Sequence, residues 1–216
     1  MGGQFSETKP VQNRSLCGNG PLQNVGTAKI GQVGISRHRQ RISIVTISMH
    51  KMSVGVFSQF LGSLSRLLDH AAVYAEARKI DPSILLNARL YPNMYNLTRQ
   101  VGEAIRHAVV ASALLAGVEP PVFSETEPDI AELTARIAIA VDFLQKLRLD
   151  QFDGADEKEV IFTFRNGSGR KFTCQSLLLT FSVPQFFFYV TTAYDILRHC
   201  GVDLDFLGTQ DRASQD

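Results

Sequence analysis

The sequence predicts a mainly α-helical protein, a bundle of four helices with a small β-hairpin before the last helix. Three observations support this fold class. Apolar residues recur at three- and four-residue intervals in four segments, the pattern of helices that bury one face. The apolar period changes to two only between residues 159 and 173, where a pair of short strands is expected. Glycine and proline residues divide these segments at positions that suit helix ends.

The first helix is predicted over residues 52–79, and Asp81-Pro82 ends it. A long connection follows, from 81 to 96, with a short helical turn at 83–86. It carries Asn87, Arg89 and Tyr91, which is unusually rich polar and aromatic chemistry for a loop. Two interpretations stay open. The connection lines a binding site, or it is a packed strap that crosses the end of the bundle.

The second helix is predicted over residues 97–115, ending at Ala116-Gly117, and it is apolar over more than one face. His107 lies near its middle and can point inward or sideways. A single hydrogen bond satisfies most mid-helix histidines, and a metal-ligand role is rarer. The third helix is expected after the capping-box spacing of Ser124 to Glu127 and ends near Arg148.

Residues 159–173 alternate between apolar and polar side chains on either side of Asn166-Gly167, which predicts a β-hairpin. The last helix is predicted over residues 175–200. Pro184 must kink or restart it, because proline has no N–H to donate. Gly201 is well placed to end it.

Gln185 and Tyr189 lie four residues apart in the last helix, so both project from one face. In a helical bundle this spacing can build a metal site or the wall of a pocket. Amide and phenol groups are poor metal ligands at neutral pH. We therefore expect either group to hydrogen-bond His107. In the alternative interpretation, Tyr189 packs into the core and no such cluster forms.

Charge is unevenly distributed along the chain. Residues 1–48 carry six Lys or Arg against one acidic residue, and the rest carries sixteen against twenty. The acidic body argues against a nucleic-acid-binding surface. Residues 1–44 are rich in polar and small residues and have no apolar period, which predicts a disordered extension or sequence upstream of the working start near Val45. Residues 209–216 are expected to fray.

The three cysteines are far apart and form no C-x-x-C pair, which favours a reducing compartment. No uninterrupted apolar run approaches the ~20 residues that cross a bilayer, and the N-terminus does not resemble a signal peptide. These features predict a cytoplasmic protein with no membrane partner.

From about Thr46 to Gly208 the sequence resembles the DUF1993 family, within the DinB/YfiT-like superfamily of helical bundles. The matching segments, in collinear order, are Ser48-Met49, Ser53-Val54, Lys79 to Pro82, Leu86 to Leu90, Ala116 to Pro121, Gln151 to Gly154, Val190 to Tyr194 and Asp205 to Gly208. The resemblance implies a DinB-like four-helix bundle over residues 45–208 and a homodimer.

Members of the wider superfamily often bind a divalent metal through three histidines, one from the second helix and two from the last. His107 matches the second-helix position, whereas Gln185 and Tyr189 stand at the last-helix positions. One histidine is too few for zinc, which takes about three protein ligands even in open catalytic sites. The sequence therefore predicts no metal cofactor.

Two functions stay open. The first is a metal-free small-molecule-binding or interaction module, with Asn87, Arg89 and Tyr91 as further pocket residues. The second is an enzyme of the superfamily's thiol-dependent transferase or metal-dependent hydrolase type. There His107 would be the acid/base candidate, and Gln185, Tyr189 and Tyr194 would orient the substrate. Nucleic-acid binding through the basic N-terminal segment is the weakest hypothesis, because no aromatic residues accompany its arginines.

Overall fold

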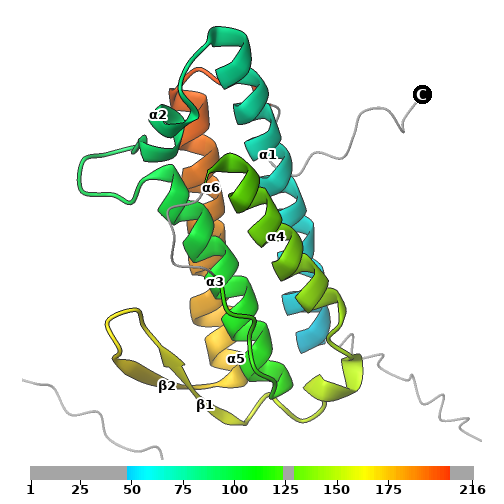
Figure 1. Ribbon diagram of the computed structural model, residues 1–216. Helices are drawn as coiled ribbons and strands as arrows, with labels where there is room; N and C mark the ends of the chain where they lie inside the picture. The colour runs from blue at the N-terminus through cyan, green and yellow to red at the C-terminus, as the bar shows by residue number, and fades with distance from the viewer. Residues whose placement is uncertain (1–47, 124–128, 205–216) are drawn as a thin grey trace, which may run out of the picture. The chain divides into compact units, whose positions relative to one another are not determined.

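A computed structural model describes residues 48–123 and 129–204. The extension predicted for residues 1–44, the tail predicted for 209–216 and the capping box predicted at 124–127 lie outside this part. The described elements are η1 Lys51–Gly55, α1 Val56–Arg78, α2 Pro82–Asn87, α3 Leu97–Ala116, α4 Ile130–Gln145, η2 Leu149–Phe152, β1 Glu159–Thr163, β2 Gly169–Thr173, α5 Cys174–Ser176, η3 Leu177–Ser182 and α6 Val183–His199. The mainly helical bundle with a β-hairpin before its last helix is confirmed (Figure 1).

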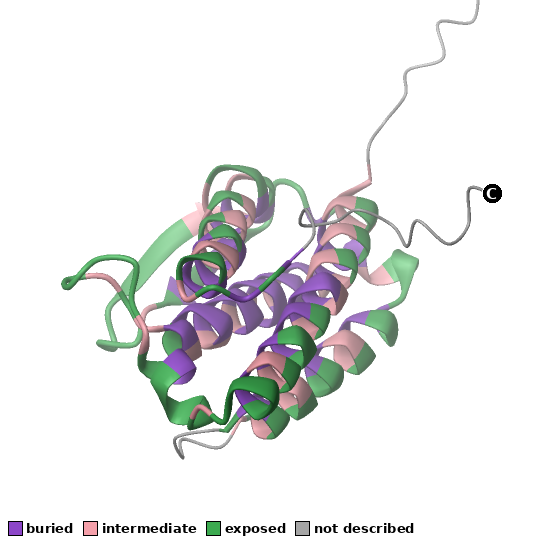
Figure 2. Cartoon of the chain, turned by 90° about the horizontal axis from the view of Figure 1, so that it is seen from above, coloured by how far each residue is buried: buried purple, intermediate pink, exposed green. Residues whose placement is uncertain are grey.

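The bundle is built around α3, which packs against α6 on one side and α4 on the other, while α1 packs against α4. Buried residues line the sides of the helices that face one another, and exposed residues line the outer sides (Figure 2). Thirteen of the twenty α3 residues are buried, including Val109 and Ala113 on its second apolar face. Val110 and Leu114 on the same face are only partly buried, and the homodimer stays a prediction.

Side-chain caps and a left-handed residue set the ends of the first helices. Lys79 adopts φ 55° directly after α1, and the Asp81 side chain accepts a hydrogen bond from the Ser83 N–H at the start of α2. Asp129, rather than the predicted Ser124, is the N-cap of α4, because its carboxylate accepts from the Glu132 N–H at 2.7 Å. α4 ends at Gln145, three residues before the predicted Arg148.

The β-hairpin pairs Glu159 with Thr173 at one end and Thr163 with Gly169 at the other. β1 alternates strictly between exposed and buried residues, so Val160 and Phe162 face the bundle. The turn contains Gly167 at φ 80°, a left-handed conformation that favours glycine. The structure confirms the predicted hairpin, whose tip lies beside α3 and η3.

The last helical segment changes geometry where the sequence predicts a break. It is π-helical from Leu177 to Ser182 and becomes α-helical at Val183, directly before Pro184. The proline ring cannot donate a hydrogen bond and crowds the carbonyl one turn earlier, which explains the change of hydrogen-bonding pattern at this point.

Gly201 ends the last helix at φ 89°, as predicted. A Cβ there would lie 3.0 Å from the Tyr74 hydroxyl, which donates to the Cys200 carbonyl at 3.1 Å. This hydrogen bond connects the end of α6 to α1. A side chain at position 201 would be strained by the positive φ and would also clash with the Tyr74 hydroxyl.

One described segment, Cys174–His199, is long and apolar enough to cross a membrane by length and composition. Part of this segment lies in the core of the bundle, where Phe186 and Val190 are buried. A core helix of a bundle passes the same test, so the segment is weak evidence for a membrane span.

Replacing Phe162 by alanine should lower the free energy of unfolding by about 3–5 kcal/mol, because its ring is fully buried among the aromatic side chains beneath the hairpin. Ile161→Ala is the matched control on the outward face of the same strand and should cost less than about 1 kcal/mol. Urea denaturation measures both values. Equal losses for the two variants would show that the hairpin does not pack on the bundle as described.

Candidate functional site

A cavity of about 550 Å³ opens between α3, the hairpin tip and the start of the last helix. We call it the His107 cavity. Its lining residues are Tyr95, Arg99, Glu103, Arg106, His107, Phe164, Arg165, Asn166, Phe181, Gln185 and Tyr189. Aromatic rings and arginines supply most of this wall, and Glu103 is its single carboxylate.

Glu103 is the most unusual group of the cavity, because its carboxylate is only 5% exposed yet carries charge. Three arginines surround it. Arg165 on the hairpin donates its Nε–H to Oε1, Arg106 Nη1 lies 3.5 Å from Oε2, and Arg99 Nε lies 4.0 Å from Oε1. Buried charge is costly without partners, so these contacts explain how the carboxylate is tolerated inside the bundle.

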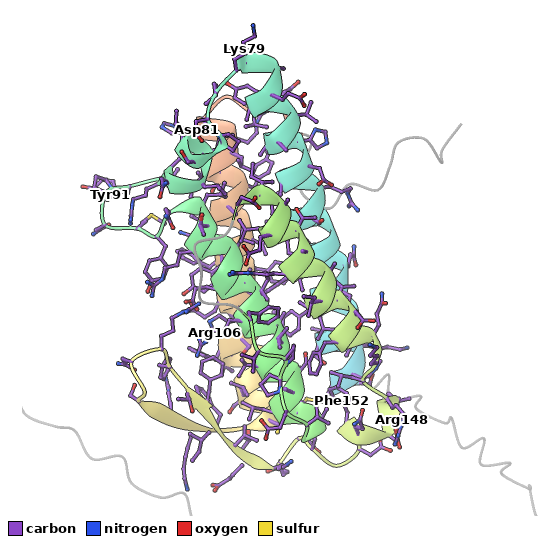
Figure 3. All side chains as sticks on the ribbon, viewed as in Figure 1. Lys79, Asp81, Tyr91, Arg106, Arg148 and Phe152 are labelled. Atoms are coloured by element: carbon purple, nitrogen blue, oxygen red, sulfur yellow. The ribbon has the colours of Figure 1, made fainter. Side chains whose placement is uncertain are left out.

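Arg106 links α3 to the hairpin in two further ways. Its Nη2 donates to the carbonyl oxygen of Thr163, and its guanidinium lies 4.8 Å from the centre of the Phe162 ring. The side chain extends from α3 toward the hairpin (Figure 3). Together with the Arg165–Glu103 contact, this fixes the hairpin tip beside the cavity.

His107 follows Glu103 by one helical turn and is 3% exposed. Its ring stacks on Phe162 and on Tyr189, with centroid distances of 5.4 and 5.6 Å, and meets the edge of Phe181 at 5.3 Å. Burial, reinforced by the charge of Arg106, lowers the pKa of His107 to about 4. The imidazole is therefore neutral at pH 7.

Gln185 and Tyr189 line the same wall as His107, so the structure brings these three predicted residues together. The contact between His107 and Tyr189 is ring stacking, with an interplanar angle of 26°, and not the hydrogen bond that the sequence suggested. His107 Nδ1 is buried without a hydrogen-bond partner within the described residues. Burial also raises the pKa of the Tyr189 phenol, which stays neutral at pH 7.

The connection from residue 81 to residue 96 is called the strap below, and its predicted pocket residues lie outside the His107 cavity. Asn87 donates to the Ser83 carbonyl at 3.0 Å and lines a separate hollow of about 430 Å³. Arg89 donates to the Met94 carbonyl, and Tyr91 is 63% exposed at the outer tip of the strap (Figure 3). These side chains pair locally or face solvent, and the loop between α2 and α3 projects outward from the bundle (Figure 1).

Tyr194 also lies outside the cavity, half-buried against the core further along α6. The residue of the strap that does reach the cavity is Tyr95. Its ring is nearly parallel to that of Tyr189, at 14° and 6.4 Å, and Arg99 lies over it at 4.2 Å. Buried Gln100 fixes its position by donating to the Tyr95 carbonyl at 3.1 Å.

Sequence reasoning missed the Glu103 cluster, although part of its pattern is visible. Arg99, Glu103 and Arg106 recur at four- and three-residue intervals on a helix that is otherwise largely apolar. Charged residues in such a position need partners, which suggests a buried ion-pair network. The hairpin member, Arg165, is 62 residues away from Glu103 and has no local pattern.

The residues at the three metal-ligand positions of the superfamily do not fit a divalent metal. They offer one imidazole, one amide and one phenol, and amide and phenol groups are poor ligands at neutral pH, where zinc needs about three protein ligands. Three guanidinium groups line the same cavity and would repel a cation. Across the described parts of the chain, no group of three His, Cys, Asp or Glu side chains is arranged to hold a metal ion.

The His107 pKa generates a prediction for stability. Since its value is about 4 in the folded protein against an ordinary 6.5, the unfolded chain binds this proton more tightly. The stability that neutral His107 contributes is complete above about pH 6.5 and is lost as the pH falls toward about 4. Between pH 7 and pH 4.5, wild type should lose about 2 kcal/mol more than His107→Gln, measured by urea denaturation. Parallel pH profiles for the two proteins would contradict the burial of a neutral imidazole.

Comparison with known proteins agrees with this architecture. A crystal structure of a DinB family member protein from Shewanella denitrificans, solved at 1.83 Å, superposes with a TM-score of 0.67 and is 32% identical, covering 75% of this chain and 93% of that chain. Among curated protein sequences, none matches. The model of the domain of unknown function DUF1993 matches residues 49–207. The chain therefore belongs to the DUF1993 family and has a DinB-like fold.

Proposed function

We propose that this protein is a metal-free small-molecule-binding protein whose ligand occupies the His107 cavity. The observation that carries the proposal is the convergence of His107, Gln185 and Tyr189, from two helices, on the wall of one cavity. These positions correspond to metal-ligand positions in the superfamily, but their side chains present ring faces and an amide. They suit contact with an organic molecule better than coordination of an ion.

The size and lining of the cavity support this function. A volume of about 550 Å³ lies within the usual range of small-molecule sites, roughly 300–1,000 Å³. Phe164, Phe181 and Tyr189 supply apolar contact area. Gln185 and Asn166 supply amide groups that can donate and accept hydrogen bonds, which would fix the orientation of a ligand.

An enzyme of the transferase or hydrolase type is the alternative, and it depends on His107 as acid or base. Proton transfer is most efficient when the pKa of the catalytic group lies near the working pH. A pKa of about 4 makes His107 a weak base at pH 7 and leaves almost none of it as an acid. The chemistry of this residue therefore favours binding over proton transfer.

The homodimer and the cytoplasmic location belong to the proposal as predictions. Analytical ultracentrifugation at micromolar concentration tests the dimer, and a single monomeric species would contradict it.

Gln185→Trp should abolish ligand binding, because the larger side chain would fill the cavity wall from α6. Gln175→Trp is the matched control, since Gln175 is exposed at the start of the same helical segment and lies outside the lining. Native mass spectrometry of the dialysed proteins, each incubated with the same defined mixture of small metabolites, should show adducts with wild type and Gln175→Trp only. Equal adducts with Gln185→Trp would place binding elsewhere.

Metal content gives an independent check of the same proposal. Protein purified without chelators and analysed by elemental mass spectrometry should contain far less than one equivalent of zinc, nickel or manganese. A stoichiometric metal that disappears in His107→Gln would overturn the metal-free interpretation and favour the enzyme.

A further inference from the structure

We infer that the ligand of the His107 cavity is an organic anion that combines a carboxylate or phosphate with a flat aromatic ring. This inference rests on the proposed function and names the chemical class of its ligand. It follows from two independent features of the lining: an excess of guanidinium groups at one end and parallel aromatic faces beside it.

The first feature is the charge of the wall. Arg99, Arg106 and Arg165 contribute three positive charges, and Glu103 contributes the single negative charge among the lining residues. His107 is neutral at pH 7 for the reasons given above, so two positive charges remain unbalanced. Such a wall attracts anions and rejects cations, most strongly where water is excluded.

Two of these arginines, Arg99 and Arg165, also keep N–H donors that are open to further contacts. The side chains of Arg99 and Arg165 are 46% and 55% exposed although both approach Glu103. A guanidinium has five N–H donors, and Glu103 engages Arg165 through its Nε–H. The remaining donors form the planar fork that binds carboxylate or phosphate oxygens in pairs.

Glu103 prepares this end of the cavity in advance. Its buried carboxylate holds guanidinium groups from α3 and from the hairpin close together, despite their mutual repulsion. Binding of an anion then requires little reordering of long side chains, which would otherwise reduce affinity. One carboxylate holds the three arginines together but balances only one of their three positive charges.

The aromatic part follows from Tyr95 and Tyr189. Their rings are nearly parallel, with centroids 6.4 Å apart, and Tyr95 is 39% exposed at the edge of the strap. Stacked aromatic groups lie about 3.5–4 Å apart between carbon atoms. A flat ligand ring can therefore stack between Tyr95 and Tyr189 after a small outward displacement of Tyr95. Arg99 lies over the Tyr95 ring and places the positive charge next to this stack.

Calorimetric titration with four probes tests the inference on the full-length protein: benzoate, phenyl phosphate, neutral benzamide and inorganic phosphate. At low ionic strength, we expect benzoate or phenyl phosphate to bind at least about tenfold more tightly than benzamide and inorganic phosphate. Whichever of the two anions binds more tightly identifies the headgroup. Binding should weaken as sodium chloride is added.

Arg165→Gln should weaken the better anion at least about fivefold, because it removes a guanidinium from the cavity. Arg170→Gln is the matched control, since Arg170 belongs to the same hairpin but lies outside the lining and should leave affinity within about twofold. If circular dichroism shows that Arg165→Gln is unfolded, Arg99→Gln replaces it. Its guanidinium lines the same wall from α3.

The outcomes separate this inference from the proposed function. If benzamide bound as tightly as benzoate, the ligand would not need a negative charge, and the anionic part of the inference would be overturned. If inorganic phosphate bound as tightly as phenyl phosphate, the aromatic part would be overturned. Neither anion binding at about 10 mM would overturn the inference as a whole. In each case the Gln185→Trp comparison shows independently whether the cavity binds any small molecule.

Discussion

The arrangement of the site depends on one buried carboxylate. Glu103 lies inside the bundle on α3 with its side chain 5% exposed, and a charge in that position needs cationic partners. α3 supplies Arg99 and Arg106 at helical spacing, but the third partner, Arg165, comes from the hairpin. The need to pair this carboxylate therefore brings the hairpin tip to α3, and the His107 cavity is the space that they enclose with the last helix.

The same arrangement sets the environment of His107. His107 is covered on its faces by Phe162 and Tyr189, and its low pKa follows from that burial. The hairpin contributes Phe162, and the hairpin is fastened by Arg106 and Arg165. The positive charge of the cavity wall is thus a consequence of how Glu103 is paired, because its three arginine partners all line the cavity. Such a charge attracts anions and repels cations.

Local pattern was enough to predict most of the fold. The turn residues Asn166-Gly167, the break before Pro184 and the stop at Gly201 each have a local cause, and each lies where the sequence indicated. The N-cap of α4 is Asp129, whose carboxylate has the same capping chemistry as the Ser124 hydroxyl predicted for that role.

The site was predictable only in part. The four-residue spacing of Gln185 and Tyr189, with the family resemblance, predicted that both approach His107, and all three line one cavity. The contacts that define the cavity join residues far apart in the chain, as Arg165 and Glu103 do, and periodicity carries no information about them. The polar composition of the strap suggested pocket residues there, but Asn87 and Arg89 hydrogen-bond carbonyl groups only a few residues away in the chain.

The most direct test of the central claim is a double-mutant cycle between Glu103 and Arg165, built from Glu103→Gln, Arg165→Gln and the double variant. The free energies of unfolding, measured in urea at pH 7, should give a coupling energy of about 1 kcal/mol or more in favour of the pair. That result is expected because one partner is buried, although Arg165 is half exposed. A coupling energy within about 0.3 kcal/mol of zero would contradict the account, because the hairpin would then be held beside α3 without the help of the buried carboxylate.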